Sequence, residues 1–204
     1  MATRPEVFNR PEDDSDRAEA VARYLLHLSL DEPESEPITQ MRLQKLLYYA
    51  QAWGLVSSGG KRSLFENPIE AWPHGPVVSS VYQAFKGYSK NPIDPHEASN
   101  PPSLSREDRA IVQWVWSHYK QFSAVALREM THRHAPYERA WQRRESGGSN
   151  TIPTEEIADF FASKYDALVP EGLKFSDIRE ANLDYERGNM APLGEVMDRY
   201  RDAI

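Results

Sequence analysis

The chain has 204 residues, a formal net charge of −7 and no cysteine. This length permits one domain with a buried core, and the lack of cysteine excludes disulfides, thiol nucleophiles and thiolate metal sites. The acidic balance disfavours non-specific nucleic-acid binding, which needs clustered Lys and Arg. Surplus acids suit a basic protein partner, although acids that only keep a surface soluble give the same balance. No apolar run could span a bilayer and the N-terminus lacks a signal-peptide core, so we expect a cytoplasmic protein.

The apolar pattern predicts a mainly α fold that begins with two helices. The first covers residues 16–30, where apolar residues recur at helical spacing. The second is suited to begin after Thr39, as an N-cap, and to end at Gly59 and Gly60. Its apolar face is formed by Leu43, Leu46, Leu47, Ala50 and Trp53.

A short β element is expected next. Residues 68–72 alternate like a strand, and the turn at residues 74–76 reverses the chain, so we expect a small two-stranded element near residues 64–72. Pro76 suits the first turn of a third helix, and Gly87 suits its left-handed C-terminal cap. The apolar side of that helix would carry Val77, Val78, Val81, Tyr82 and Phe85.

More helices are predicted after a proline-rich loop at residues 89–104, which fits either a loop within one domain or a hinge between two halves. We favour the loop. Ser105 is suited to cap the next helix together with Asp108, and further helices are expected to start near Ser123 and Pro136. Thr154 is suited to cap a later helix. The apolar residues of these helices are Ile111, Val112, Val115, Trp116, Tyr119, Ile157, Phe160, Phe161 and Tyr165.

The chain divides into three expected segments: a flexible N-terminal segment at 1–14, a helical domain at 15–168 and a C-terminal helical extension at 169–204. The extension carries an amphipathic stripe formed by Leu193, Val196, Met197 and Tyr200. Such a stripe fits a partner-docking arm, and it also fits a terminal helix that packs on its own domain, which is the commoner role of such stripes.

Catalytic and metal-binding patterns are weak. His132 and His134 lie near Glu129 and Glu138, but residues two apart on a helix face different sides, whereas helical metal ligands need a spacing of three or four. The chain has no nucleophile elbow, Walker loop or dinucleotide fingerprint. We therefore expect no catalytic residue, metal or cofactor, and we expect His132 to satisfy backbone groups or to pack against Trp141.

Two blocks resemble a known family, the Panacea domain. Residues 43–53 (LQKLLYYAQAW), 68–72 (PIEAW) and 75–77 (GPV) resemble its first block, and a later stretch with Ser123, Ala124 and Leu127 resembles its second. The resemblance covers roughly residues 18–141. The chain departs from the family pattern at Gly54, where a larger residue, often histidine, is expected. The matching positions include Leu43, Leu47, Tyr48, Trp53, Trp72, Gly75, Pro76, Thr131, His132 and Trp141.

The resemblance implies an antitoxin rather than an enzyme. It would neutralise a co-encoded protein toxin by direct protein–protein binding. The resemblance also implies that relatives neutralise unrelated toxins, among them nucleotide-transferring enzymes related to alarmone synthetases. An adaptor that delivers a partner to a protease has the same sequence signature, and a metal-dependent hydrolase using His132 or His134 is the third alternative. The sequence does not indicate an oligomeric state.

Gln44 and Lys45 are polar positions within the first block. They flank the apolar stripe of their helix and are expected to point away from the core, either to contact the turn after residue 68 or to bind a partner. The aromatic residues of this block fit core packing better than base stacking, because no basic groove accompanies them. Trp53 and Trp72 are expected to be buried anchors.

Overall fold

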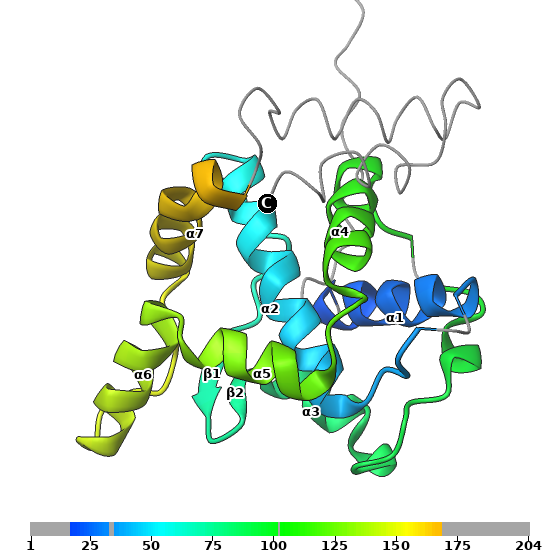
Figure 1. The fold of residues 1–204 in the computed structure, drawn as a ribbon, viewed down its shortest axis with the longest axis horizontal. Coiled ribbons are helices and arrows are strands. Elements are labelled where there is room, and N and C mark those ends of the chain that lie inside the picture. The colour runs from blue at the N-terminus through cyan, green and yellow to red at the C-terminus, as the bar shows by residue number, and fades with distance from the viewer. Residues whose placement is uncertain (1–16, 33–34, 102, 169–204) are drawn as a thin grey trace, which may run out of the picture.

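Residues 17–32, 35–101 and 103–168 are described by a computed structural model, shown as a ribbon in Figure 1. Within these ranges, seven α-helices surround one two-stranded antiparallel sheet. The fold is therefore mainly α with a small β element, as the sequence predicts. The segments expected at 1–14 and 169–204 lie outside the described residues.

Helix α2 (Gln40–Ser57) is the centre of the fold. It begins after Thr39, whose hydroxyl accepts a hydrogen bond from the Arg42 N–H, and it ends just before Gly59 and Gly60, which both have positive φ. Every residue from 42 to 55 is buried, so α2 is covered on all sides. Figure 1 shows α2 running through the middle of the molecule, with α7 on one side and α4 on the other.

The hairpin differs from the sequence-based expectation. Strand β1 (Ile69–Trp72) lies where a strand was predicted, but its partner is β2 (Gly75–Val78), with Trp72 opposite Gly75. The predicted helix start at Pro76 and cap at Gly87 were therefore wrong. Helix α3 (Ser79–Ala84) begins after β2, and Gly87 lies inside the 3₁₀-helix Lys86–Tyr88. Short apolar runs rich in valine fit both a strand and a helix.

A loop continues the sheet beyond β1. The Ala71 N–H donates to the Asn150 carbonyl at 2.7 Å, and the Ile152 N–H donates to the Ile69 carbonyl at 2.8 Å. No strand pairing was predicted for this loop. One edge of the hairpin is thus covered by backbone from the segment before α7.

The other helices begin close to the predicted residues. They are α1 (Arg17–Leu30), α4 (Arg106–Tyr119), α5 (Ala124–His132), α6 (Ala135–Glu145) and α7 (Thr154–Leu168). Ser105 caps α4 by accepting from the Asp108 N–H, and Ser123 caps α5 by accepting from the Ala126 N–H. Thr154 is the first residue of α7 rather than its cap. The 3₁₀-helix Pro95–Ala98 packs against α1, so the proline-rich segment is a loop within the fold.

Aromatic rings fill the core around α2. The ring of Trp53 lies 4.8 Å from that of Trp114 and 5.5 Å from that of Phe161, measured between centroids, and the rings of Tyr49 and Tyr119 stack at 3.9 Å. The Trp53 indole N–H donates to the Tyr119 hydroxyl at 3.1 Å. These contacts hold α4 and α7 against α2.

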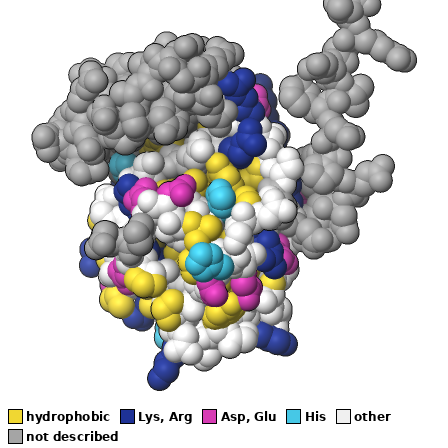
Figure 2. Space-filling view, turned by 90° about the vertical axis from the view of Figure 1, so that its right-hand side faces the viewer, with side chains coloured by type: hydrophobic (Ala, Val, Ile, Leu, Met, Phe, Trp, Pro, Cys, Tyr) yellow, Lys and Arg dark blue, Asp and Glu magenta, His cyan; other side chains and the backbone are white. Residues whose placement is uncertain are grey.

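The surface is mixed in character. Figure 2 shows acidic, basic and apolar side chains interspersed on the face at the right of Figure 1. Among the described helices, none combines the length and the apolar character needed to cross a membrane.

Candidate functional site at the hairpin edge

The second edge of the hairpin is paired by two side chains of α2. The Lys45 ammonium group donates to the Pro76 carbonyl at 2.9 Å, and the Gln44 side-chain oxygen accepts from the Val78 N–H at 2.7 Å. An edge strand leaves alternate N–H and C=O groups without a neighbouring strand. Gln44 and Lys45 supply those missing partners.

These two residues correct one expectation. Gln44 is 2% exposed and Lys45 is 1% exposed, so neither points away from the core. Of the two roles considered for them, the internal contact to the hairpin is the one observed. In this conformation they present no surface to a partner.

Gly75 brings the hairpin close to two other motif residues. Its φ is +98°, in the region that favours glycine. A Cβ atom at this position would lie 2.7 Å from Lys45 Cε, 2.9 Å from Lys45 Nζ and 3.1 Å from Thr131 Oγ1. Thr131 is fully buried and its hydroxyl donates to the Arg128 carbonyl at 3.0 Å. The Lys45 side chain from α2 and the Thr131 side chain from α5 therefore meet the hairpin at Gly75, where only a glycine fits.

Burial changes the protonation of Lys45. Desolvation, assisted by the positive charge of Arg128, lowers the pKa of the Lys45 amine from 10.5 to about 7. Within the described part of the chain, its hydrogen-bond partner is a carbonyl group rather than a carboxylate. The amine is therefore partly neutral near pH 7.

A ladder of stacked rings connects α5 to α6. The rings of His132 and Tyr137 stack at 4.7 Å, those of Tyr137 and Trp141 at 6.2 Å, and the Arg144 guanidinium lies 4.6 Å from the centroid of Trp141. The Tyr137 hydroxyl donates to the Trp72 carbonyl at 2.8 Å. Tyr137 thus stands between His132 and Trp141, which were expected to touch directly, and it ties α6 to the hairpin.

His132 and His134 lie in different surroundings. Burial is the main cause that lowers the pKa of His132, and Arg128, Lys45 and His74 lower it further, while Glu129 raises it. The His134 Nδ1 atom lies 3.3 Å from the Tyr48 hydroxyl, and burial lowers its pKa to about 4. Among the described residues, no group of three or more His, Asp or Glu side chains is placed to hold a metal ion.

The remaining motif residues belong to the core, with one correction. Leu43, Leu47, Tyr48 and Trp53 are fully buried. Trp72 is only half-buried: its indole N–H donates to Glu70 at 2.9 Å and its ring lies 5.1 Å from that of Tyr82. The expectation that Trp72 is a buried anchor was therefore wrong.

Gly54, the departure from the family pattern, has a packing explanation. A Cβ atom at Gly54 would lie 3.2 Å from the Cβ of Leu64. The segment after α2 therefore packs directly on the helix backbone at this position. A larger residue, as the resemblance leads one to expect, would push Leu64 away.

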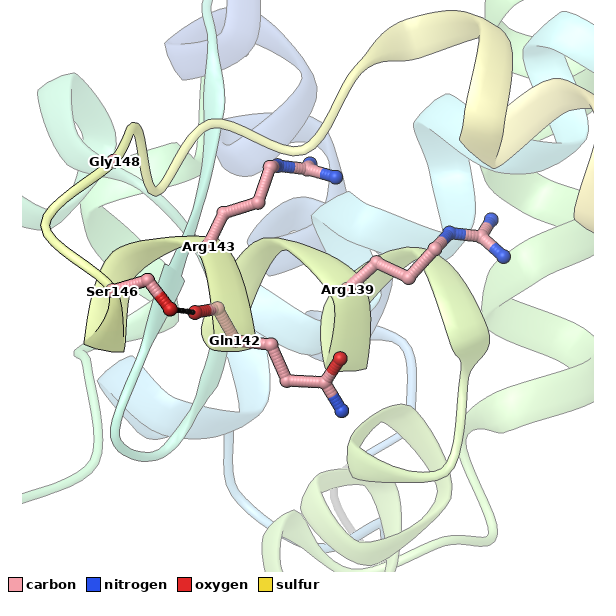
Figure 3. A pocket seen from close by; sticks show the side chains of 5 residues that line it. All are labelled: Arg139, Gln142, Arg143, Ser146 and Gly148. Carbon is pink, nitrogen blue, oxygen red and sulfur yellow. Dashed lines mark hydrogen bonds between the residues drawn. The ribbon is translucent and has the colours of Figure 1, made fainter.

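A separate hollow of about 550 Å³ lies at the C-terminal end of α6 (Figure 3), and the sequence did not indicate it. It is lined by Arg139, Gln142, Arg143, Ser146 and Gly148. Both arginines bind the Glu156 carboxylate, at 2.7 Å from Arg139 Nε and 3.2 Å from Arg143 Nη1. Because this carboxylate offsets their charge, the hollow is a weaker candidate than the hairpin edge.

Taken with the fold, this geometry defines a helical domain in which a central buried helix caps the edge of a β-hairpin. Residues 43–141 match the family described as Antitoxin SocA-like, Panacea domain. This match, over 99 of the 204 residues, confirms the resemblance to the Panacea domain. The matched stretch begins at Leu43 and ends at Trp141, and it contains Lys45, Gly75 and Thr131.

One curated relative is Antitoxin SocA of Caulobacter vibrioides (strain NA1000 / CB15N). It is 42% identical over 66 residues, which cover 31% of this chain and 34% of the relative. The similarity thus spans about a third of that relative's length. No solved structure matches the chain.

Proposed function

We propose that this protein is the antitoxin of a toxin–antitoxin pair and that it neutralises a co-encoded protein toxin by direct binding. The observation that carries the proposal is the Panacea domain at residues 43–141, together with the 42% identity to a protein named Antitoxin SocA. Both products would meet in the cytoplasm, where they are made. The role is one of binding rather than catalysis.

The motif residues support a binding role because they are engaged inside the protein. Gln44, Lys45 and Gly75 join α2 to the hairpin, and Tyr137 joins the hairpin to α6. Side chains used in this way fix a shape and leave recognition to surface positions. We therefore propose that the motif builds a common scaffold and that other residues select the toxin. An enzyme related to alarmone synthetases is one class of toxin that such a scaffold would bind.

The test is co-expression with the product of the neighbouring gene. We expect the neighbour alone to arrest growth, the pair to grow, and the two proteins to purify as a stable complex. Trp53→Ala, which removes a fully buried ring, serves as a destabilised control that should rescue growth less well than wild type. Failure to rescue by any neighbouring gene pair, in cells that accumulate both proteins, would contradict the antitoxin proposal.

The two alternatives give different results in the same assay. An adaptor would rescue growth only in cells that contain the protease and would lower the amount of toxin. Direct binding rescues in protease-deficient cells and leaves the toxin level unchanged. A hydrolase would lose rescue on substitution of His132 or His134 by Gln while still binding the toxin.

A further inference from the structure

The hollow at the C-terminal end of α6 combines open space with two arginines that one carboxylate holds side by side. Its volume is about 550 Å³, which is room for a side chain of a partner (Figure 3). Arg139 and Arg143 are four residues apart, so they lie on one face of α6. Their guanidinium groups contact the Glu156 carboxylate of α7 at 2.7 Å and 3.2 Å.

Glu156 positions both guanidinium groups but leaves donors of Arg139 available. Arg139 contacts Glu156 through Nε, and within the described residues its two terminal nitrogen atoms form no hydrogen bond. The Arg139 side chain is 52% exposed. Arg143 is more engaged, because its Nη2 also donates to the Thr151 carbonyl at 3.3 Å. Arg139 therefore presents the paired N–H donors that suit a carboxylate.

The backbone at this helix end does not repel an anion in the usual way. A helix C-terminus ends in carbonyl groups, which disfavour negative charge nearby. At the end of α6 the carbonyls of residues 142–144 accept hydrogen bonds from the N–H groups of residues 146–148, at 2.8–3.2 Å. Gly147 has a φ of +81°, which lets the chain turn back over the helix end. The electrostatic character of the hollow is therefore set by the two arginines and Glu156.

The charge beside the hollow suits one carboxylate. Two guanidinium groups and one carboxylate leave one positive charge there, in a chain whose net charge is −7. Glu138, Glu145 and Glu155 are exposed on the same two helices. A polyanion such as nucleic acid would also meet these acids and be repelled. A single acidic side chain avoids that repulsion.

We propose that the hollow receives one acidic side chain, Asp or Glu, of the toxin and that Arg139 is the residue that binds it. This inference rests on the proposed antitoxin function. Four of the five residues that line the hollow lie beyond Trp141, where the match to the Panacea domain ends. Contacts that select one toxin belong outside a shared scaffold, and arginine is enriched among the residues that dominate protein interfaces.

The test measures the dissociation constant of the full chain for the purified product of the neighbouring gene, by calorimetry at low and at physiological ionic strength. We expect Arg139→Gln to raise this constant about ten-fold at low ionic strength, as for the loss of one charged hydrogen-bonded contact. The effect should shrink as salt screens the charge.

Arg133→Gln is the matched control, because Arg133 is exposed and follows the end of α5. It should leave the dissociation constant unchanged. Circular dichroism verifies that both variants are folded, as expected when an exposed pair such as Arg139 and Glu156 is removed. If Arg139→Gln does not fold, Arg139→Lys replaces it and should weaken binding several-fold, because the paired donors are lost.

The acidic partner residue is identified by replacing each surface Asp and Glu of the neighbouring product with Asn or Gln. One replacement should weaken binding as much as Arg139→Gln does, and combining the two should add no further loss. Full additivity with every acidic replacement would overturn the inference. A single-stranded oligonucleotide that binds more tightly than the product, and is lost in Arg139→Gln, would replace the acidic side chain by a nucleic acid.

Failure of the proposed function gives a different result from failure of the site. A wild-type chain that binds no neighbouring product overturns both. A wild-type chain that binds and rescues growth, while Arg139→Gln or its Arg139→Lys replacement binds equally well, overturns the assignment of the hollow alone.

Discussion

The ammonium group of Lys45 donates a hydrogen bond to the carbonyl of Pro76 at 2.9 Å, and this contact joins the central helix to the edge of the hairpin. The contact has both a stabilising and a destabilising effect on the fold. It satisfies a buried carbonyl, but it holds an amine where the charged form is disfavoured. The stability of the fold should therefore depend on pH through Lys45.

We predict that wild type gains stability over Lys45→Met as the pH rises from 7 to 10.5. Folding lowers the pKa of Lys45 from 10.5 to about 7, so the unfolded state binds more protons between these values and stability increases with pH. Below pH 7 the cost of burying the charge is fully present. The free-energy difference between the two proteins should change by up to ~5 kcal/mol, as measured by urea unfolding at several pH values.

The control for this experiment is Lys90→Met, which alters an exposed lysine and should track wild type at every pH. The free-energy difference at Lys45, rather than absolute stability, isolates the amine, because tyrosine ionisation at high pH affects both proteins alike. A difference between wild type and Lys45→Met that stays constant from pH 6 to 10 would be incompatible with a lowered pKa.

Gly75→Ala should destabilise the protein more than Gly59→Ala. Both glycines have positive φ, which costs an alanine roughly 1–2 kcal/mol. At Gly59 nothing lies within 4 Å of an added Cβ, whereas at Gly75 the atom meets Lys45 and Thr131. We expect about 3 kcal/mol or more for Gly75→Ala, because overpacking adds 1–3 kcal/mol. Thermal unfolding compares the two, and equal losses would show that the close approach does not matter.

Local signals made the helix starts predictable. Thr39, Ser105 and Ser123 each accept a hydrogen bond from an N–H three residues later, so the information lies within one turn of helix. The second strand was not predictable in this way. Val77 and Val78 suit a strand or a helix, and the choice is made by pairing with β1 on one side and with α2 on the other.

The candidate site was identified as a set of residues but not as an arrangement. The motif named Gln44, Lys45, Gly75 and Thr131, yet the burial of Gln44 and Lys45 follows from α2 being covered on all sides. The contacts from Lys45 to Pro76 and from Gln44 to Val78 join residues that are 31 and 34 positions apart, and one sequence carries no local signal for such contacts.

The two motif tryptophans should differ in their contribution to stability. Trp53→Ala removes a ring that is fully buried against Trp114 and Phe161, and we expect a loss of roughly 3–5 kcal/mol. Trp72→Ala should cost about 1–2 kcal/mol, since Trp72 is half-buried and contacts Tyr82 at the surface. Chemical denaturation of both variants gives the comparison. A larger loss of stability for Trp72→Ala than for Trp53→Ala would mean that the hairpin is more important to the core than the burial of Trp72 indicates.

Asp108→Asn should be among the more damaging polar substitutions. Asp108 is fully buried, and its carboxylate binds Arg17 and Arg62, the latter at 2.6 Å. Removing the charge leaves Arg17 without compensation in a side-chain position that is 12% exposed, and we expect a loss of roughly 3 kcal/mol. The neighbouring substitution Glu107→Gln, at a side chain that is 51% exposed, should cost less than 0.5 kcal/mol, as is usual at the surface. Similar urea midpoints for the two variants would contradict this interpretation.

The C-terminal extension lies outside the described residues, and its role remains a prediction. If the motif forms a scaffold, contacts that select the toxin lie elsewhere. The stripe of Leu193, Val196, Met197 and Tyr200 suits a helix that docks in a groove of a partner.

Truncation before Phe175 should therefore leave a folded protein that no longer binds or neutralises the toxin. Calorimetry reports the melting temperature of the truncated chain, and co-expression reports neutralisation. Truncation after Leu193 removes most of the stripe and should have the same effect. If truncation lowers the melting temperature substantially, the stripe packs on its own domain; if neutralisation persists, the extension is not the docking element.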